Sequence, residues 1–229
     1  MSERLTIKQG PRAKVAPAAE AAFQAIRDGQ VIVAPIEHSY VFVADAFNHG
    51  AVAKIHQLRG DDLGVATQVI IRDASVVKGI GYGFHEGAEA LAKYFWPGLL
   101  TIITPAQRGL TWNLGDSKEL GKVALRVPSN RFMTALLALS GPLAIAYASL
   151  AKGKPPKNTT MIPALDKDLA YIIDAGELAE HPSGAGSTIV EIRNKELHVI
   201  REGAISIEEL ITTHPSVVRP TADSTGATA

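Results

Sequence analysis

The chain has no cysteine among its 229 residues. That absence excludes disulfide bonds, thiolate catalysis and metal sites with cysteine ligands. A protein without disulfides fits a reducing compartment, and we predict a cytoplasmic location.

Long apolar runs and an excess of one charge are missing as well. No apolar stretch approaches the roughly 18 residues that span a bilayer, and the charged N-terminal residues are not followed by the apolar run of a secretory signal. Lysine plus arginine and aspartate plus glutamate number 23 each, so the formal net charge is zero. A dedicated nucleic-acid-binding domain is usually distinctly basic. We therefore predict no membrane partner and no domain devoted to nucleic acid.

Several short motifs of known chemistry are also absent. The chain has no GxxxxGK[ST] phosphate loop, no HExxH zinc motif and no GxSxG nucleophile motif. The glycine-rich run GIGYG at residues 79–83 lacks GxGxxG spacing and is predicted to be a loop. The seven histidines are scattered, and we predict no metal site.

The most informative segment that is present is VIVAPIEHSYVFVADAF at residues 31–47. A buried strand is predicted at 31–34, ended by Pro35, and a second apolar run follows at 41–44. The four polar residues between them, 37–40, lose water there, at about 1–3 kcal/mol for each group left unsatisfied. Two interpretations stand at this point: a ligand pocket, or a tight strand connection whose polar groups satisfy one another.

Helical and strand patterns alternate through the rest of the chain. Helices are predicted at residues 17–28, 49–59, 87–94, 130–139 and 207–212, and further strands at 65–71, 99–104, 123–127, 142–148, 171–174, 187–192 and 197–201. No repeat or linker interrupts residues 17–212, so we predict one α/β domain there. Residues 1–16 are predicted to be a flexible lead-in, and residues 213–229 a disordered tail.

Two arginines are embedded in apolar strand sequence, Arg126 in VALRVP and Arg201 in VIREGA. Burying a guanidinium costs several kcal/mol unless an anion pairs with it, and its planar donors suit a carboxylate or a phosphate. The partner is either an acidic residue of the protein or a bound anion. Ser187 and Thr188, which follow a glycine in GSTIV, favour the bound anion.

The order of these segments resembles the Sua5/YrdC/YciO family over about residues 17–212. The opening segment resembles the family's P-T-[DE]-T-x-Y-G-L through Pro35, Glu37 and Tyr40. Further likenesses are WPG at 96–98, VALRVP at 123–128, GSTIVE at 186–191 and IREGAI at 200–205. Each motif alone is weak, and their common order carries the resemblance.

Typical members of this family make threonylcarbamoyl-adenylate from threonine, bicarbonate and ATP. The resemblance implies one YrdC-like α/β domain, with a twisted mixed β-sheet, flanking helices and a large concave cavity. It also implies a nucleotidyltransferase of tRNA modification that uses ATP with Mg²⁺ as substrate and holds no tight cofactor. The second substrate would be a small amine or carboxylate.

The chain departs from the family at its reactive positions. The family's cationic K-G-R falls on residues 59–61, where Arg59 keeps a charge and Asp61 reverses one. A carboxylate near a polyphosphate repels it unless a metal ion or a proton intervenes. The family's S-A-N falls on Tyr147-Ala148-Ser149. Because the framework motifs stay intact, we predict a retained pocket with altered ligand chemistry.

The resemblance assigns roles to the candidate site residues. His38, which replaces a threonine of the opening motif, is the predicted catalytic base. The predicted nucleotide- and substrate-binding residues are Tyr40, Arg59, Asp61, Arg126, Tyr147, Ser149, Ser187, Thr188 and Arg201, with the arginines as anion ligands and the serines and threonine as hydroxyl donors.

A second hypothesis is a non-catalytic protein of the same fold that binds a small anionic ligand or double-stranded RNA. RNA binding is implied by the resemblance, and Lys152, Lys154 and Lys157 would supply a local basic patch. The other interpretation of these lysines is a solvated loop. The zero net charge keeps RNA the lesser partner.

Overall fold

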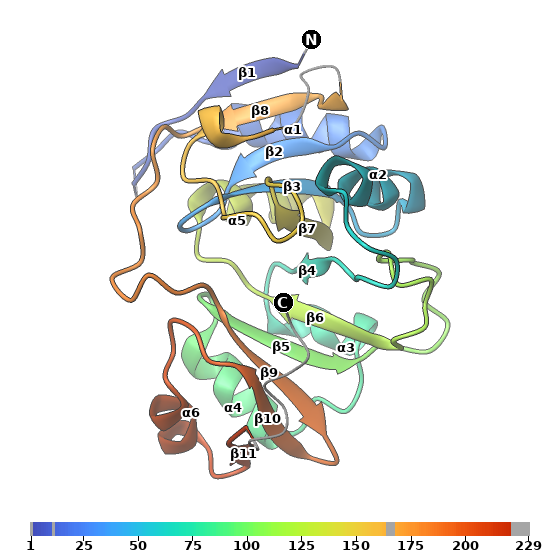
Figure 1. The fold of residues 1–229 in the computed structure, drawn as a ribbon, viewed down its shortest axis with the longest axis vertical. Coiled ribbons are helices and arrows are strands. Elements are labelled where there is room, and N and C mark those ends of the chain that lie inside the picture. Colours follow the sequence, from blue (N-terminus) through green and yellow to red (C-terminus); the bar gives the residue numbers. More distant parts are fainter. Residues whose placement is uncertain (1, 11, 164–167, 221–229) are drawn as a thin grey trace. The chain divides into compact units, whose positions relative to one another are not determined.

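The computed structural model describes residues 2–10, 12–163 and 168–220. Its internal contacts divide the chain into two compact units, each of mixed α/β structure (Figure 1). Unit 1 comprises Met1–Arg72, Thr111–Leu120 and Pro128–Glu180, and unit 2 comprises Asp73–Leu110, Gly121–Val127 and His181–Ala229. One domain over residues 17–212 stays a prediction.

The strands of unit 1 follow the order β1-β8-β2-β3-β7-β4. Their bounds are β1 Glu3–Thr6, β8 Tyr171–Asp174, β2 Ile32–Pro35, β3 Tyr40–Asp45, β7 Leu143–Tyr147 and β4 Gln68–Ile70. β8 pairs in parallel with β1 and β2, while β3 pairs antiparallel with β2 and β7, and β7 antiparallel with β4. The end of β2 and the start of β3 are therefore joined by the loop 36–39, which carries the polar residues Glu37, His38 and Ser39.

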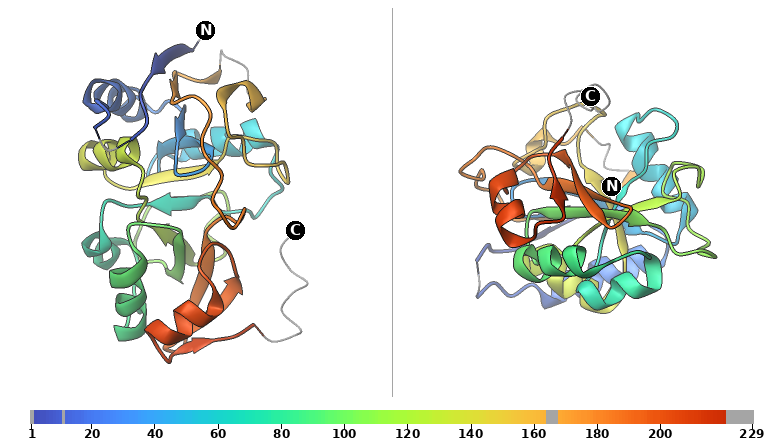
Figure 2. Two further views of the ribbon diagram at one scale, coloured as in Figure 1. Left: turned by 90° about the vertical axis from the view of Figure 1, so that its left-hand side faces the viewer. Right: turned by 90° about the horizontal axis from the view of Figure 1, so that it is seen from below.

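Three helices pack on the sheet of unit 1: α1 Ala16–Arg27, α2 His49–Arg59 and α5 Arg131–Ser140. α1 and α5 lie together on one face and α2 lies on the other (Figure 2). The buried side of α1 consists largely of alanines, which lets α5 approach it closely. Asn130 begins α5, because its side-chain oxygen accepts the backbone N–H groups of Phe132 and Met133. A 3₁₀ turn, η2 Thr159–Met161, lies in the long connection after β7.

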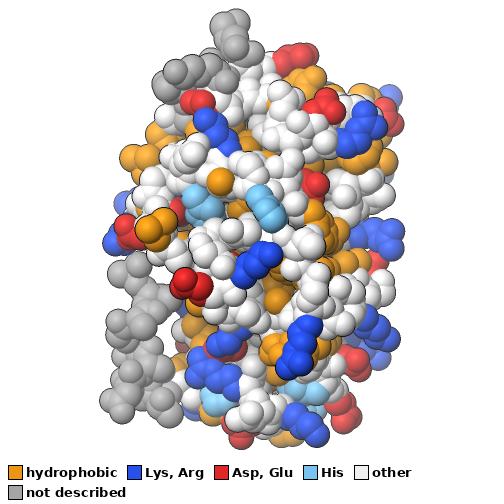
Figure 3. Space-filling view, turned by 90° about the vertical axis from the view of Figure 1, so that its right-hand side faces the viewer, with side chains coloured by type: hydrophobic (Ala, Val, Ile, Leu, Met, Phe, Trp, Pro, Cys, Tyr) orange, Lys and Arg blue, Asp and Glu red, His pale blue; other side chains and the backbone are white. Residues whose placement is uncertain are grey.

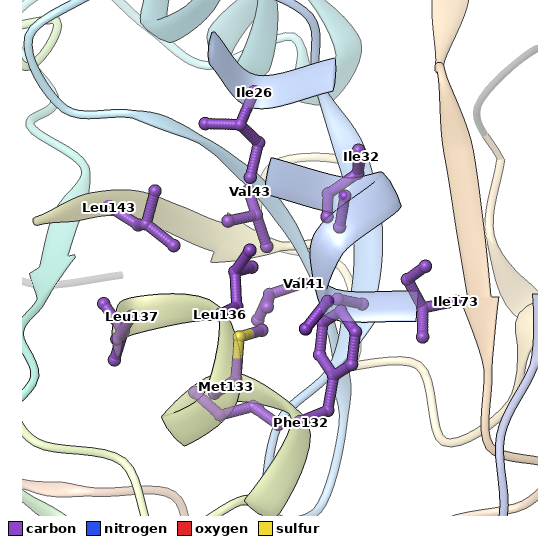
Figure 4. Close-up of a cluster of buried hydrophobic side chains, with 14 of the residues drawn as sticks. Ile26, Ile32, Val41, Val43, Phe132, Met133, Leu136, Leu137, Leu143 and Ile173 are labelled. Carbon is purple, nitrogen blue, oxygen red and sulfur yellow. The ribbon is translucent and has the colours of Figure 1, made fainter. Parts of the chain in front are cut away.

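The core of unit 1 lies between the sheet and the pair α1 and α5 (Figure 4). Phe132, Met133 and Leu136 from α5 meet Val41 and Val43 from β3 there, and all are almost fully buried. Each large apolar side chain buried in this way contributes about 1.5–3 kcal/mol. This packing sets the position of β3 and of the polar loop that precedes it.

Unit 2 has the strand order β6-β5-β9-β10-β11. Their bounds are β6 Lys122–Arg126, β5 Leu100–Pro105, β9 Thr188–Arg193, β10 Glu196–Arg201 and β11 Val217–Val218. β5 pairs antiparallel with β6 and parallel with β9, and β10 pairs antiparallel with β9 and parallel with β11. The helical segments are η1 Ala74–Val76, α3 Val77–Ile80, α4 Glu86–Phe95 and α6 Ile207–Thr213.

Most predicted elements are confirmed, and the exceptions are instructive. Residues 3–6, expected in a flexible lead-in, form β1 instead, because their backbone pairs with β8. The run 79–83 is not wholly a loop: α3 includes Gly79 and Ile80, and Gly81 bridges to Ala106. In the expected tail, residues 217–218 form β11, and residues 221–229 lie outside the described part. In the described part of the chain, no helix is both long and apolar enough to cross a membrane.

Candidate functional site

The first polar cluster lies where α2 ends in unit 1. Gly60 takes a left-handed conformation, with φ of 66°, and turns the chain back on the helix. The turn brings Asp61 against Arg59, whose Nε donates to both carboxylate oxygens at 3.1 and 2.9 Å. The two side chains are only 14% and 5% exposed, so they form an ion pair inside the protein.

The same guanidinium also binds the end of β7. Its Nη1 donates to the carbonyl oxygens of Tyr147 at 2.6 Å and Ser149 at 3.3 Å. The Arg59 carbonyl in turn accepts the backbone N–H of Ala151 at 2.7 Å. Arg59 therefore holds the C-terminal end of α2 to the segment that follows β7.

His56, one turn before Arg59 on α2, completes this cluster. Its Nδ1 lies 2.9 Å from Oδ2 of Asp61, and its Nε2 lies 2.9 Å from the carbonyl oxygen of Leu114. These two contacts orient the ring between Asp61 and the backbone of Leu114. We name His56, Arg59 and Asp61 the Arg59 cluster.

The Arg59 cluster changes the expectation drawn from the sequence. Asp61 was expected to repel a polyphosphate unless a metal ion or a proton intervened. The structure instead pairs its charge with Arg59, two residues away. The anion-binding role of Arg59 stays a prediction, and in this structure the guanidinium binds groups of the protein.

Ser149 and Tyr147 flank the Arg59 cluster differently. Ser149 is 6% exposed, and its Oγ makes no hydrogen bond. A buried hydroxyl without a partner is uncommon in proteins, and a ligand group is one way to satisfy it. Tyr147 pairs with Val41 in the sheet and its half-buried side chain packs against the core of unit 1.

Tyr40 is held by groups of unit 1. It is fully buried, its hydroxyl donates to the carbonyl of Gly176 at 2.6 Å and it accepts the N–H of Ala175 at 2.9 Å. Burial raises the pKa of Tyr40 from 10 to about 12, with a smaller contribution from the Asp174 carboxylate, while the Ala175 N–H opposes the rise. The hydroxyl of Tyr40 is therefore satisfied within the protein, by groups of the segment 174–176 and not by other residues of the loop.

His38 is oriented by a contact within unit 1. Its Nδ1 lies 2.8 Å from the carbonyl oxygen of Ala179. His38 also lines a cavity of about 480 Å³, and Arg59, Asp61 and Ser149 are not among the residues that line it. The catalytic role of His38 stays a prediction.

The second polar cluster lies in unit 2. Arg201, at the end of β10, donates from Nη2 to the carbonyl of Ser187 at 2.8 Å and is otherwise exposed. Ser187 is buried, and its Oγ accepts the Thr101 hydroxyl at 3.1 Å. Arg126 is 5% exposed and donates from Nε to the carbonyl of Gly98 at 2.8 Å. We name Arg126, Ser187, Thr188 and Arg201 the Arg201 cluster.

Thr188 acts as a structural connection in this cluster. Its hydroxyl donates to the carbonyl of Ile205 at 2.6 Å and accepts the N–H groups of Gly203 at 2.9 Å and Ile205 at 3.0 Å. The side chain is fully buried. Three bonds use the hydrogen-bonding capacity of one hydroxyl, so its role as a ligand donor stays a prediction.

The sequence pointed to most of these groups but missed His56. The signal was present, because His56 stands three residues before Arg59 on one helix and therefore on nearly the same face. Among the residues described, no group of three or more histidines, aspartates or glutamates is placed to hold a metal ion.

Comparison with known protein families places these observations in context. The family model named for Sua5, YciO and YrdC, and described as telomere recombination, matches residues 24–203. Threonylcarbamoyl-AMP synthase of Bacillus subtilis is 32% identical over 189 residues, which cover 81% of this chain and 53% of that protein. A Mycobacterium tuberculosis protein to which the same activity is assigned provisionally is 32% identical over 187 residues, covering 81% of this chain and 84% of that protein.

Solved structures agree on the fold. Sua5 of Pyrococcus abyssi, in a crystal structure with L-threonine, superposes with a TM-score of 0.84 at 23% identity, covering 96% of this chain and 63% of that chain. Escherichia coli YciO gives a TM-score of 0.77 at 23% identity, covering 92% of this chain and all of that chain. These likenesses confirm the predicted fold class, a mixed β-sheet with flanking helices.

Proposed function

Because this chain belongs to the Sua5/YciO/YrdC family and is related to threonylcarbamoyl-AMP synthases, we propose that it is an ATP-dependent enzyme that forms a carbamoyl-adenylate. We further propose that its substrate chemistry differs from that of its relatives, because the positions expected to bind substrate carry other residue types.

In the proposed reaction, an amine first adds to bicarbonate and water leaves, which gives a carbamate. A carbamate oxygen then attacks the α-phosphorus of ATP, and the bond to the β-phosphate oxygen breaks as pyrophosphate leaves. Catalysis of such a step rests mainly on positioning and on neutralising phosphate charge. Mg²⁺ is proposed to enter with ATP as part of that substrate.

The Arg201 cluster is the proposed anion-binding part of this enzyme. The bond from Arg201 to the Ser187 carbonyl goes to a neutral acceptor and leaves the guanidinium charge in place. The side chain is also exposed, so a phosphate or carboxylate has access to it. In unit 1, the Ser149 hydroxyl is the proposed donor to a ligand, since it lacks any other partner.

The observation that carries the proposal is the 32% identity to threonylcarbamoyl-AMP synthase of Bacillus subtilis over 81% of this chain. The hydrogen bonds of Arg126 to the Gly98 carbonyl and of Arg201 to the Ser187 carbonyl support it, because they position both arginines. The base role of His38 remains a prediction.

The direct test is pyrophosphate release from MgATP, measured with bicarbonate and a panel of amines that includes threonine. We expect release that requires both bicarbonate and an amine, and a preferred amine other than threonine. Release with threonine as the best substrate would contradict the altered chemistry while supporting the enzyme. No release with any amine, together with no heat on titration with MgATP, would overturn the enzymatic proposal.

Restoring the family's residues tests whether the Arg59 cluster limits nucleotide binding. The double variant D61R/Y147S should bind MgATP more tightly, because Arg59 loses its internal carboxylate. Because arginine is much larger than aspartate at this buried position, D61N serves as a second variant of nearly unchanged size. D62N is the matched control on an exposed carboxylate. Equal affinity in all three variants would show that residue 61 does not adjoin the nucleotide.

A second candidate function is a non-catalytic binding protein for a small anion, and the internal Arg59–Asp61 pair favours it. That pair removes one cation from the set expected to bind polyphosphate. Binding of MgATP or a small anion without pyrophosphate release, over the whole amine panel, would favour this candidate over the enzyme.

RNA binding remains a weaker proposal. Lys157 pairs with Glu180 at 2.7 Å, and Lys152 approaches Asp62 at 3.9 Å, so acidic residues offset this basic loop. On the face seen in Figure 3, cationic and anionic side chains are interspersed. A gel-shift titration with double-stranded RNA tests this proposal.

The cytoplasmic location also stays a prediction.

A further inference from the structure

The cavity of about 480 Å³ in unit 1 has features of a ligand site. Its volume falls within the range typical of small-molecule sites, roughly 300–1,000 Å³. Its lining includes residues 7–10 together with Ala13 and Val15, and residues 129–132 at the start of α5. The first of these two groups precedes residues 24–203, the range that the family model matches.

The lining residues 7–10 and Ala13 are held to the rest of unit 1 by hydrogen bonds. The N–H of Ile7 donates to the carbonyl of Asp174 at 2.8 Å, and the Gln9 amide donates to the carbonyls of Ala175 at 2.7 Å and Glu177 at 2.9 Å. Arg131 Nε donates to the carbonyl of Ala13 at 2.9 Å. These long-range bonds define the shape of the cavity without any ligand, which lowers the entropic cost of binding.

The charge of the lining is mainly positive. Lys8 and Arg131 contribute cations, and His38 adds an imidazole. The lining carboxylate, Glu37, accepts the backbone N–H of Ser129 at 2.7 Å and its hydroxyl at 3.2 Å. It therefore sits at the N-terminal end of α5, where the helix dipole favours a negative charge.

The remainder of the lining is apolar. Val15, Phe132 and Leu178 contribute side chains that are at most 6% exposed, and Pro35 and Ala13 adjoin them. Apolar walls with a few polar groups are typical of small-molecule sites. In such a site the apolar part of the ligand, its body, is buried against the walls, and its charged group, its head, binds the polar side chains.

We propose that this cavity binds a small anionic molecule with an apolar body, either a carboxylate or a phosphate monoester, with Lys8 and Arg131 facing its anionic head. The residues of the Arg59 cluster do not line this cavity. Its test needs no ATP, so a failure here would leave the proposed reaction untouched.

The experiment is a calorimetric titration of the full chain with probes that share one body and differ in the head group. The probes are 3-phenylpropionate, 3-phenylpropyl phosphate and the neutral 3-phenylpropanol, with inorganic phosphate as a head group without a body. We expect the first two to bind with a dissociation constant near or below about 1 mM, and the other two to bind about tenfold more weakly.

Two variants with the same change in charge locate the binding. Lys8→Glu should weaken binding of 3-phenylpropionate by about tenfold, because a cation is replaced by an anion beside the carboxylate. Lys14→Glu, on the same exposed segment but outside this cavity, should change it less than about twofold, because solvent screens the charge. The proposal would be overturned if Lys8→Glu and Lys14→Glu lost equal affinity for 3-phenylpropionate. It would also be overturned if 3-phenylpropanol bound as tightly as 3-phenylpropionate, or if none of the probes bound.

Discussion

The Arg59 cluster of unit 1 and the Arg201 cluster of unit 2 use a guanidinium in opposite ways. Arg59 is buried, pairs with the Asp61 carboxylate and donates to two carbonyls of its own unit. Arg201 is exposed and donates to the neutral carbonyl of Ser187. The charge of Arg59 is compensated within the protein, whereas the charge of Arg201 is accessible to a ligand.

A residue type that is retained can still have a different partner. An arginine stands at position 59, as a cation does in the family pattern, yet in this structure it pairs with an aspartate two residues later. In unit 2, no such replacement accompanies Arg201, and the GSTIV and IREGAI motifs are intact. We therefore propose that the substrate chemistry is altered and that the change lies in unit 1.

The largest expected effect comes from removing the carboxylate of the Arg59 cluster. Asp61→Ala leaves the buried guanidinium of Arg59 and the ring of His56 without their anionic partner. Loss of one member of a buried ion pair typically costs about 3–5 kcal/mol in the free energy of unfolding. Urea denaturation followed by circular dichroism measures it.

The neighbouring carboxylate supplies the control. Asp62 is 84% exposed and lies 3.9 Å from Lys152, so Asp62→Ala should change the free energy of unfolding by less than about 1 kcal/mol. If the two variants lose the same stability, the Arg59 cluster is not the internal ion pair described above.

The next effect tests the hydroxyl of Thr188 in unit 2. Thr188→Val keeps the shape of the side chain but leaves the N–H groups of Gly203 and Ile205 without their acceptor. We expect a loss of about 3 kcal/mol in the free energy of unfolding, because each buried unsatisfied group costs about 1–3 kcal/mol. Thr188→Ser, which keeps the hydroxyl, should lose about 1 kcal/mol; a serine variant as unstable as the valine variant would contradict this role.

A smaller effect is expected at Tyr40, and it depends on pH. Tyr40→Phe removes the partner of the Ala175 N–H and the Gly176 carbonyl, at a cost of about 2 kcal/mol in the free energy of unfolding near pH 7. The pKa of Tyr40 is raised to about 12 in the folded chain, chiefly by burial, so the folded state favours the protonated phenol.

The contribution of this phenol to stability is therefore complete below pH 10 and is lost as the pH rises toward 12. Denaturation between pH 9 and pH 12 should show a steeper decline for the wild-type chain than for Y40F. Parallel declines would mean that Tyr40 does not titrate in the folded state as described.

The secondary structure could be predicted where the pattern is local. The helix at 49–59 and the strand at 171–174 have the bounds that apolar spacing and the stop at Gly60 indicate. β1 could not be predicted, because ERLT has no alternation and its pairing partner lies far along the chain in β8. α3 could not be predicted because it has only four residues and one of them is Gly79, and glycine has a low helix propensity.

The site could be predicted only in part, for a related reason. The residue types at 59–61 follow from the sequence, and the left-handed turn at Gly60 explains why Arg59 and Asp61 meet. The partners of Tyr40 lie in the segment 174–176, more than 130 residues away, and no local pattern points to them. The place of His38 in the lining of the cavity likewise depends on the tertiary packing of residues 7–10 and the start of α5.

We propose that the charge that binds the ligand resides with Arg201 and not with Arg59. Calorimetric titration with MgATP of the wild-type chain, R201Q and R59Q tests it most directly, at a temperature where circular dichroism shows all three folded. We predict that R201Q weakens binding by about tenfold, the loss of one charge-assisted contact, while R59Q weakens it by less than about threefold and mainly lowers stability. The reverse order, with R59Q losing affinity and R201Q keeping it, would contradict the account.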